Sequence, residues 1–222
     1  MRLLLAAHGS REPAWSRVVD EIAAAVRRRA RGLDVRLGYV DVQGPRVADL
    51  LAPDVAVVPL LLSRGVHALR DIEEPAAAVG ARVTAPLGPD PRLTAALTDR
   101  LAEAGAPARV PVVLAGAGSS DPAARADVAT QARYLANVRA TDITTAYAGG
   151  DVDPVAQAVR DAGGGVAVSA YLLSPGHFSG LLEACGARWV AAPLGAHPAV
   201  IDAILARYAA SGQEPVRPRI SG

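Results

Sequence analysis

Apolar runs alternate with amphipathic stretches along the chain. In the first half the apolar runs lie near 2–7, 35–41, 54–62 and 81–85, and helical patterns lie near 12–30, 44–52, 67–79 and 90–104. In the second half the apolar runs lie near 110–116, 142–147, 164–173 and 188–192, and helical patterns lie near 121–139, 152–162, 178–186 and 197–210. Continuous apolar runs of this length are typical of parallel strands buried on both faces. The pattern predicts an α/β protein.

Three pairs of segments repeat at nearly constant spacing. LLLAAHGSREP at 3–13 resembles VVLAGAGSSDP at 112–122, VPLLLSRG at 58–65 resembles SAYLLSPG at 169–176, and APLGPDPRLTAALTDRL at 85–101 resembles APLGAHPAVIDAILARY at 192–208. Their first residues are 109, 111 and 107 positions apart, so a unit of roughly 110 residues occurs twice. We therefore predict two similar doubly wound domains, each with a four-stranded parallel sheet. They are expected at residues 1–104 and 110–208, with a flexible tail at 211–222.

Composition narrows the class of protein. The 222 residues are 51% hydrophobic with a net charge of +1, and no basic stripe suggests a nucleic-acid partner. No apolar run approaches the roughly 20 residues of a membrane span, and the apolar start stops at His8, too early for a secretory signal. We expect a cytoplasmic monomer or homodimer.

Two residue counts exclude particular chemistries. Cys185 is the single cysteine, which excludes an internal disulfide and a cysteine-rich metal site. All 23 basic residues are arginine, so a Walker A phosphate loop and a Schiff-base lysine are both excluded.

Two of the four histidines follow apolar runs in the first half. His8 ends the first run, and His67 lies just beyond the third, after a small-residue turn. In a doubly wound sheet of order 2-1-3-4, ligands bind where strand order reverses, between the first and third strands. A single histidine at a strand end is also typical of a hydrogen-bonded turn. A pair at one switch point favours metal handling or proton transfer, because neutral imidazole binds metals and titrates near neutral pH.

The second half has lost this pair. Ala117 stands where the first half has His8, and Phe178 falls at the position of His67. His177 lies one residue earlier, and it would approach the first pair from the opposite wall if the two domains face each other across a cleft.

A fourth histidine, His197, matches Asp90 of the first half. Each is the first residue of a predicted helix, and a helix-entry role explains both.

These residues resemble the class II tetrapyrrole chelatases, specifically the sirohydrochlorin cobaltochelatase and ferrochelatase family. The resemblance covers about residues 1–208 and rests on HGSR at 8–11, on GVHALRDI at 65–72, and on PLGPDP and PLGAHP, which close the two halves. It implies two similar α/β domains around a cleft, insertion of a divalent metal into a tetrapyrrole, and no nucleotide. The family's two metal-site histidines map onto His8 and His67, whereas the shifted His177 leaves a third ligand open.

Insertion of a divalent metal displaces two pyrrolic protons, so His8 and His67 are expected to hold the metal and accept protons. The substrate carries many carboxylates, which calls for arginine and hydrogen-bond donors beside the histidines. The candidate substrate-binding residues are Ser10, Arg11, Ser63, Arg64, Gly65 and Val66. Both serines are also suited to helix capping.

The resulting hypothesis is a lyase that inserts iron into sirohydrochlorin for sirohaem, with cobalt for cobalamin as second choice. Nickel is compatible with imidazole ligands as well. Two alternatives use the same cleft: a non-catalytic carrier of tetrapyrrole or metal, and a silent binding protein for another small anion.

Overall fold

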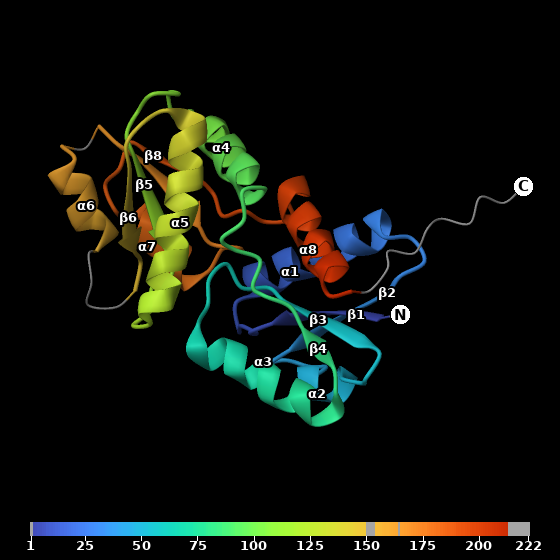
Figure 1. The fold of residues 1–222 in the computed structure, drawn as a ribbon. Helices are drawn as coiled ribbons and strands as arrows, with labels where there is room; N and C mark the ends of the chain where they lie inside the picture. The colour runs from blue at the N-terminus through green and yellow to red at the C-terminus, as the bar shows by residue number, and fades with distance from the viewer. Residues whose placement is uncertain (1, 150–153, 164, 213–222) are drawn as a thin grey trace, which may run out of the picture.

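The protein consists of two parallel sheets, each flanked by helices (Figure 1). The computed structural model describes residues 2–149, 154–163 and 165–212, and of residues 66–68 only the backbone is described. The predicted tail at 211–222 therefore lies outside the described residues from position 213 onward. In the first half the elements are β1 (Arg2–Ala7), α1 (Pro13–Arg29), β2 (Asp34–Tyr39), α2 (Val47–Leu50), β3 (Val55–Pro59), α3 (Val66–Val79), β4 (Arg82–Val83) and α4 (Leu93–Glu103). In the second half they are β5 (Val112–Gly116), α5 (Pro122–Arg139), β6 (Ile143–Tyr147), α6 (Val155–Asp161), β7 (Ala167–Tyr171), α7 (His177–Glu183), β8 (Trp189–Val190) and α8 (Pro198–Ala210).

The two sheets have the same topology, which confirms the predicted fold class. Their strand orders are β2-β1-β3-β4 and β6-β5-β7-β8, and the strands pair in parallel. The order reverses between β1 and β3, and again between β5 and β7. The fourth strands are shorter than their apolar runs predict, because each pairs with its neighbour through two residues only before the chain reaches Pro86 or Pro193.

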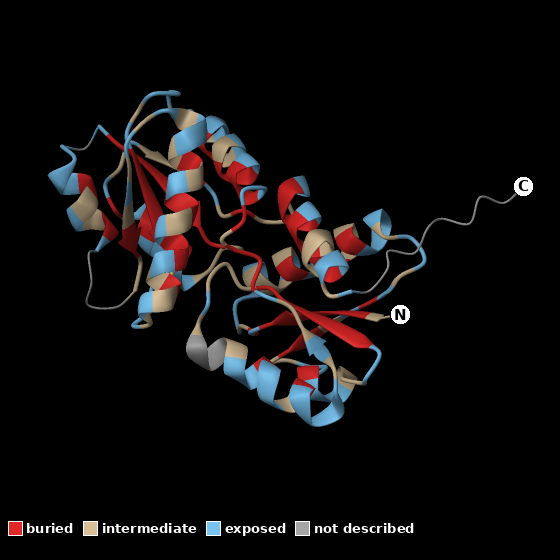
Figure 2. Ribbon diagram, in the orientation of Figure 1, coloured by how far each residue is buried: buried red, intermediate tan, exposed pale blue. Residues whose placement is uncertain are grey.

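One continuous core joins the two sheets. It takes residues from β1 and β3, from β5 and β7, and from the helices α1, α4, α5 and α8 between the sheets. Apart from Arg2 at the start of β1, the strands in the middle of each sheet are buried (Figure 2). Two smaller clusters lie on the outer faces, under α2 and α3 in the first half and under α6 and α7 in the second. We call the central cluster the shared core.

The last helix of each repeat packs on the sheet of the other repeat. Helix α4 contacts β7 and α5, and α8 contacts β3 and α1 (Figure 1). The repeat in the sequence places the division at 104–110. In three dimensions, α4 covers the second sheet and α8 covers the first. The two halves are therefore interlocked by an exchange of helices.

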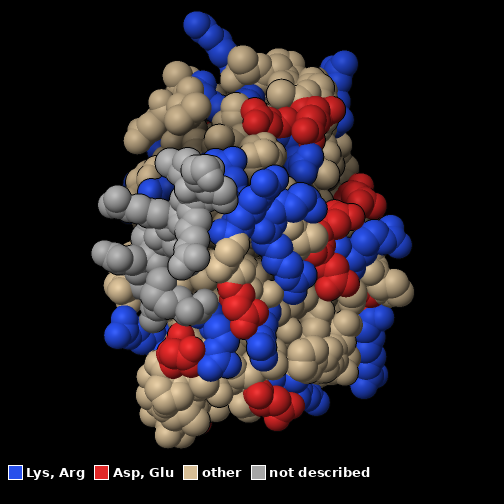
Figure 3. All heavy atoms as spheres, turned by 90° about the vertical axis from the view of Figure 1, so that its right-hand side faces the viewer, with Lys and Arg blue, Asp and Glu red and all other residues tan. Residues whose placement is uncertain are grey.

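Surface charges of both signs occur together. On the face shown in Figure 3, arginines gather in the centre with carboxylates around them. One exposed pair on the helices that join the halves is Arg29 on α1 with Asp202 on α8, at 3.2 Å. None of the helices in the described part of the chain is both long and apolar enough to cross a membrane.

Candidate functional site

His8 lies in a tight turn immediately after β1. The backbone N–H of Asp41, which follows β2, donates to the His8 carbonyl at 2.9 Å, and the His8 side chain is exposed. The next residue, Gly9, has φ +103°, and a Cβ there would lie 2.0 Å from the Asp41 carbonyl oxygen. Ser10 Oγ then accepts from the N–H of Glu12 at 3.1 Å, just before α1 begins. The turn thus projects the imidazole from the carboxyl edge of the sheet.

The second half builds the same turn without a histidine. Gly118 has φ +108°, and a Cβ there would lie 2.3 Å from the Gly149 carbonyl oxygen. Ser119 Oγ accepts from the N–H of Asp121 at 3.1 Å, as Ser10 does in the first half. Ala117 occupies the place of His8. The turn therefore belongs to the fold, and the imidazole is an addition specific to the first half.

Replacing Gly9 with alanine is expected to destabilise the protein, because the new Cβ meets a backbone oxygen that no side-chain rotation can move. A positive φ alone costs a non-glycine residue about 1–3 kcal/mol, and the steric contact adds to this. The matched control is Gly105→Ala, where φ is +76° and a Cβ meets nothing within 4 Å. Urea unfolding should show the larger loss for Gly9→Ala. Equal losses would contradict the steric argument.

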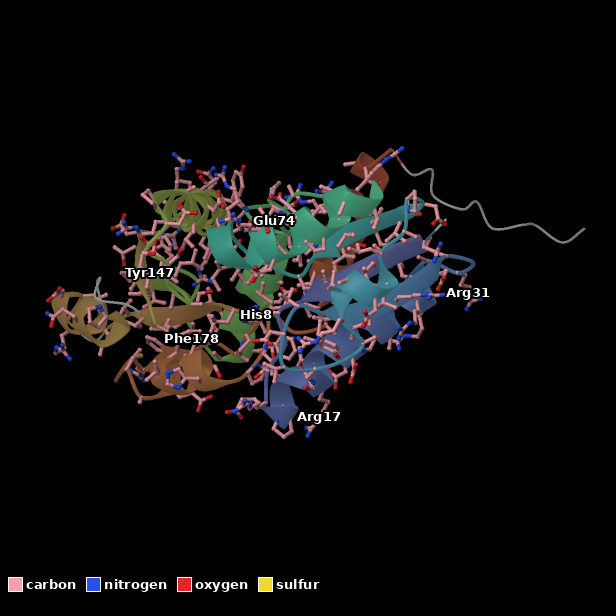
Figure 4. The ribbon with its side chains drawn as sticks, turned by 90° about the horizontal axis from the view of Figure 1, so that it is seen from below. His8, Arg17, Arg31, Glu74, Tyr147 and Phe178 are labelled. Atoms are coloured by element: carbon pink, nitrogen blue, oxygen red, sulfur yellow. The ribbon has the colours of Figure 1, made fainter. Side chains whose placement is uncertain are left out.

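A pocket of about 310 Å³ opens beside His8 between the two halves. From the first half it is lined by His8, Trp15 and the turn between them, and from the second half by residues 172–178. His177 and Phe178, the first residues of α7, lie on the opposite wall, with their ring centroids 5.5 Å apart. Figure 4 shows His8 at the boundary between the halves and Phe178 on the side of the second half. The structure thus brings His8 and His177 to one cavity.

His67 is the second residue of α3, which begins at Val66. In the second half α7 begins at His177, so Phe178 is the structural counterpart of His67, as counting along the repeat predicts. The side chains of residues 66–68, including the predicted contact Val66, lie outside the described residues. The first turn of α3 follows β3, the neighbour of β1, so its backbone is at the predicted switch point.

Asp41 is a carboxylate of the site that the sequence analysis did not single out. Its pKa is lowered, first by the hydrogen bond from the Val42 N–H at 2.7 Å, and also by Arg46 and by the charge of His8. Asp41 corresponds to Gly149 along the repeat, since both carbonyls meet the turn glycines. A carboxylate directly after β2 was the available signal.

The predicted substrate contacts have different surroundings. Arg11 is exposed ahead of α1, and the Ser10 N–H donates to Gln43 Oε1 at 3.0 Å. Ser63 and Gly65 line a second pocket. Arg64 instead points to the second half, where its guanidinium binds Asp127.

The second pocket, of about 250 Å³, lies between the ends of β3 and β5 and is mostly apolar. It shares Ala117, Leu172 and Leu173 with the pocket beside His8, so the two cavities adjoin. Tyr171 lines its wall and donates from Oη to the Leu62 carbonyl at 2.7 Å. Burial raises the pKa of this phenol, which therefore stays a donor. Figure 4 shows Tyr147, another wall residue, on the side of the second half.

His197 has the helix-entry role expected of it. Its Nδ1 accepts from the N–H of Ala199 at 3.1 Å at the start of α8, and its Nε2 lies 3.1 Å from Asp99. Asp90 makes a similar contact just before α4, where its Oδ1 accepts from the N–H of Arg92, the N-cap of that helix, at 2.9 Å. His197 therefore caps α8, and Asp90 holds the turn that enters α4.

No cluster of three or more metal-ligating side chains occurs among the residues whose side chains are described. His67 is outside that set, so the pairing of His8 with His67 stays a prediction.

Comparison with known proteins agrees with this fold. Residues 2–104 match the CbiX family model. The chain is 38% identical over 92 residues to the sirohydrochlorin ferrochelatase of Bacillus subtilis, an alignment covering 38% of this chain and 35% of that protein. It is 33% identical over 79 residues to the sirohydrochlorin cobaltochelatase of Methanococcoides burtonii, covering 32% of this chain and 60% of that protein. These alignments thus span about a third and three-fifths of the curated relatives. The solved structure of SirB from Bacillus subtilis with Fe³⁺ matches with a TM-score of 0.79 at 22% identity, covering 95% of this chain and 94% of that one.

Proposed function

We infer that this chain belongs to the CbiX family of chelatases, and we propose that it inserts a divalent metal into sirohydrochlorin. The observation that carries the proposal is the position of His8. It stands at the switch point of a doubly wound sheet, exposed in a cavity that both halves line. Ligands of such sheets bind at this edge. The match of residues 2–104 to the family model covers this half of the site.

Metal insertion requires ligands that hold the metal and then release it. Two imidazoles with open positions around the metal suit this task better than a closed four-ligand cage. As the macrocycle takes the metal, its two pyrrolic N–H groups lose their protons, and a neutral imidazole can accept one. We assign this role to His8 and His67. Asp41, whose backbone N–H donates to the His8 carbonyl, is a further candidate carboxylate next to His8.

We assign the macrocycle to the space between the sheets. The cavity beside His8 and the adjoining apolar pocket have volumes of about 310 and 250 Å³. Together they fall within the roughly 300–1,000 Å³ that small-molecule sites occupy. Trp15 and Phe178 line the first cavity and offer apolar ring faces to a flat ligand. Arg11, exposed between Ser10 and Glu12 of the cavity lining, is suited to a substrate carboxylate. His177 faces His8 from the opposite wall and is our third candidate for the metal or a proton.

Iron is our first choice of metal and cobalt the second. Imidazole and carboxylate ligands accept both, so pocket geometry and supply decide between them. Anaerobic competition with Fe²⁺, Co²⁺ and Ni²⁺ at equal concentration gives the order directly.

Turnover is the result that tests the proposal. Purified protein, sirohydrochlorin and Fe²⁺ or Co²⁺ are mixed without oxygen, and the visible spectrum of the macrocycle is followed. We expect many equivalents of metallated product per protein chain, above the rate without protein. A carrier instead binds the macrocycle and stops at about one equivalent. Failure to exceed one equivalent with any of the three metals would reject the chelatase and leave the carrier.

A further inference from the structure

A buried acidic residue of the second half holds the loop that leads to His67. The side chain of Asp127, on α5, is 4% exposed. Its Oδ2 accepts from the backbone N–H of Arg64 at 2.9 Å, and its two oxygens accept from the Arg64 guanidinium at 2.7 to 3.2 Å. The pKa of Arg64 is raised, first by this hydrogen bond and then by the charge of Asp127. The contact therefore fixes both the backbone and the side chain of residue 64.

The same loop is held at a second point by the second half. Tyr171 Oη, on β7, donates to the carbonyl of Leu62 at 2.7 Å. Gly88 leaves room for this contact, since a Cβ there would lie 1.9 Å from the phenol oxygen. Two residues after Leu62 comes Arg64, and α3 starts at Val66 with Gly65 as its N-cap. The segment that enters α3 is thus anchored from across the interface.

The anchor exists only on the side that carries the histidines. Along the repeat, Asp127 corresponds to Val18 and Arg64 corresponds to Pro175, and these residues form no ion pair. Tyr171 corresponds to Leu60, which has no hydroxyl. The repeat preserves the turns at Gly9 and Gly118, so this polar contact is a departure from the symmetry. It coincides with the departure at His8 and His67.

We propose that Asp127 is a positioning residue for metal insertion: through Arg64 it sets where the first turn of α3, and with it His67, stands relative to His8. The proposal rests on the function proposed above. It assigns the second half a task in the reaction although that half lacks the histidine pair. A misplacement of a reacting group by about 1 Å can cost about 100-fold in rate, so a loosened first turn of α3 has a measurable effect.

Asp127→Asn is the variant that tests this inference. The amide keeps the size of the side chain, but its NH₂ group faces the guanidinium donors and the charge-assisted fork is lost. We expect kcat/KM for the metal to fall about 10- to 100-fold. The KM for sirohydrochlorin should change less, because Asp127 and Arg64 line neither cavity and most of the cavity walls lie outside the loop that Asp127 holds. Loss of fold alone would not produce this split between the two substrates.

The matched control is Asp202→Asn. Asp202 pairs with Arg29 at 3.2 Å and also joins the two halves, but both side chains are exposed and lie on α8 and α1. We expect kinetics like those of the wild type. If Asp127→Asn folds poorly by near-ultraviolet circular dichroism, Arg64→Lys replaces it, because lysine keeps the positive charge and lacks the planar fork. The same split is then expected.

Hydrogen exchange tests the anchor without reference to activity. The N–H of Arg64 donates to Asp127, and the N–H of Leu69 donates to the Gly65 carbonyl in the first turn of α3. Both amides should exchange faster in Asp127→Asn than in the wild type, and amides of α1 should not. Absence of turnover in the wild type would defeat the proposed function, whereas the exchange result still decides the anchor. Unchanged exchange, unchanged kinetics, or an equal loss in Asp202→Asn would each overturn the inference.

Discussion

Replacing His8 with alanine is expected to lower kcat/KM for metal insertion by about 10²- to 10⁴-fold, the range that general acid–base groups contribute. The imidazole projects into the cavity from a turn that the second half builds equally well around Ala117. The same turn therefore forms with alanine at this position, and the substitution removes only the imidazole. Stability should change little, because the His8 side chain is exposed. The measurement is single-turnover insertion followed by visible absorbance, with unfolding in urea as a check on the fold.

A second histidine provides the control. His197→Ala removes an imidazole that caps α8 and lines neither cavity, and it should cost about 0.5–2 kcal/mol of stability without changing kcat/KM. The variants His67→Ala and His8→Ala/His67→Ala complete the set. If the two histidines serve one metal, the double variant is about as slow as the slower single variant, since groups that act as a unit are not additive. Full activity in the double variant would contradict the assignment of both residues.

Replacing Leu97 with alanine is expected to lower the free energy of unfolding by about 2–5 kcal/mol. Leu97 lies on α4, is fully buried, and belongs to the shared core. Because α4 comes from the first repeat and covers the sheet of the second, the space left by the missing leucine atoms weakens the contact between the two halves. We therefore expect both halves to lose the same amount of stability.

The two tryptophans allow the loss of stability to be measured in each half. Trp15 on α1 and Trp189 on β8 both pack against the shared core. Trp189→Phe leaves Trp15 as the fluorescent reporter, and Trp15→Phe leaves Trp189. In both backgrounds Leu97→Ala should shift the urea transition by the same amount. Leu181→Ala removes the same atoms from an exposed leucine of α7 and should change stability by less than about 0.5 kcal/mol. A shift seen by one tryptophan alone would show that the halves unfold separately.

Most of the fold could be predicted because the sequence patterns that specify it are local and occur in both repeats. The apolar runs, the side-chain contacts of Asp90 and His197 at the starts of α4 and α8, and the repeated turns each depend on neighbouring residues. The exchange of α4 and α8 could not be predicted in this way. Each helix has an apolar face and follows a fourth strand, and nothing in that face distinguishes the sheet of its own repeat from the other. Which of the two sheets a helix covers depends on the length and direction of the chain before it, and tertiary packing fixes both.

The site was predictable in part for a similar reason. His8 and the start of α3 follow from the rule that ligands bind at the carboxyl ends of strands near the switch point. The same rule applied to β2 also indicates Asp41, but the sequence analysis applied it to the two histidines alone. Arg64 was predicted to contact the substrate because it is cationic and lies in the loop before His67, and that contact stays a prediction. Its guanidinium binds Asp127, 63 positions away along the chain. Pairings of that kind depend on how the two halves dock, and a single sequence carries no signal for them.

The exchange of the terminal helices bears on why a fused chain exists at all. Two separate half-length chains could trade the same helices and form a symmetric dimer, because each would supply what the other lacks. In such a dimer every residue occurs in both subunits, so both switch points would have to be identical. Covalent fusion removes that constraint. It lets one half keep His8 while the other carries Ala117, and lets Asp127 face Arg64 where the reciprocal positions hold Val18 and Pro175.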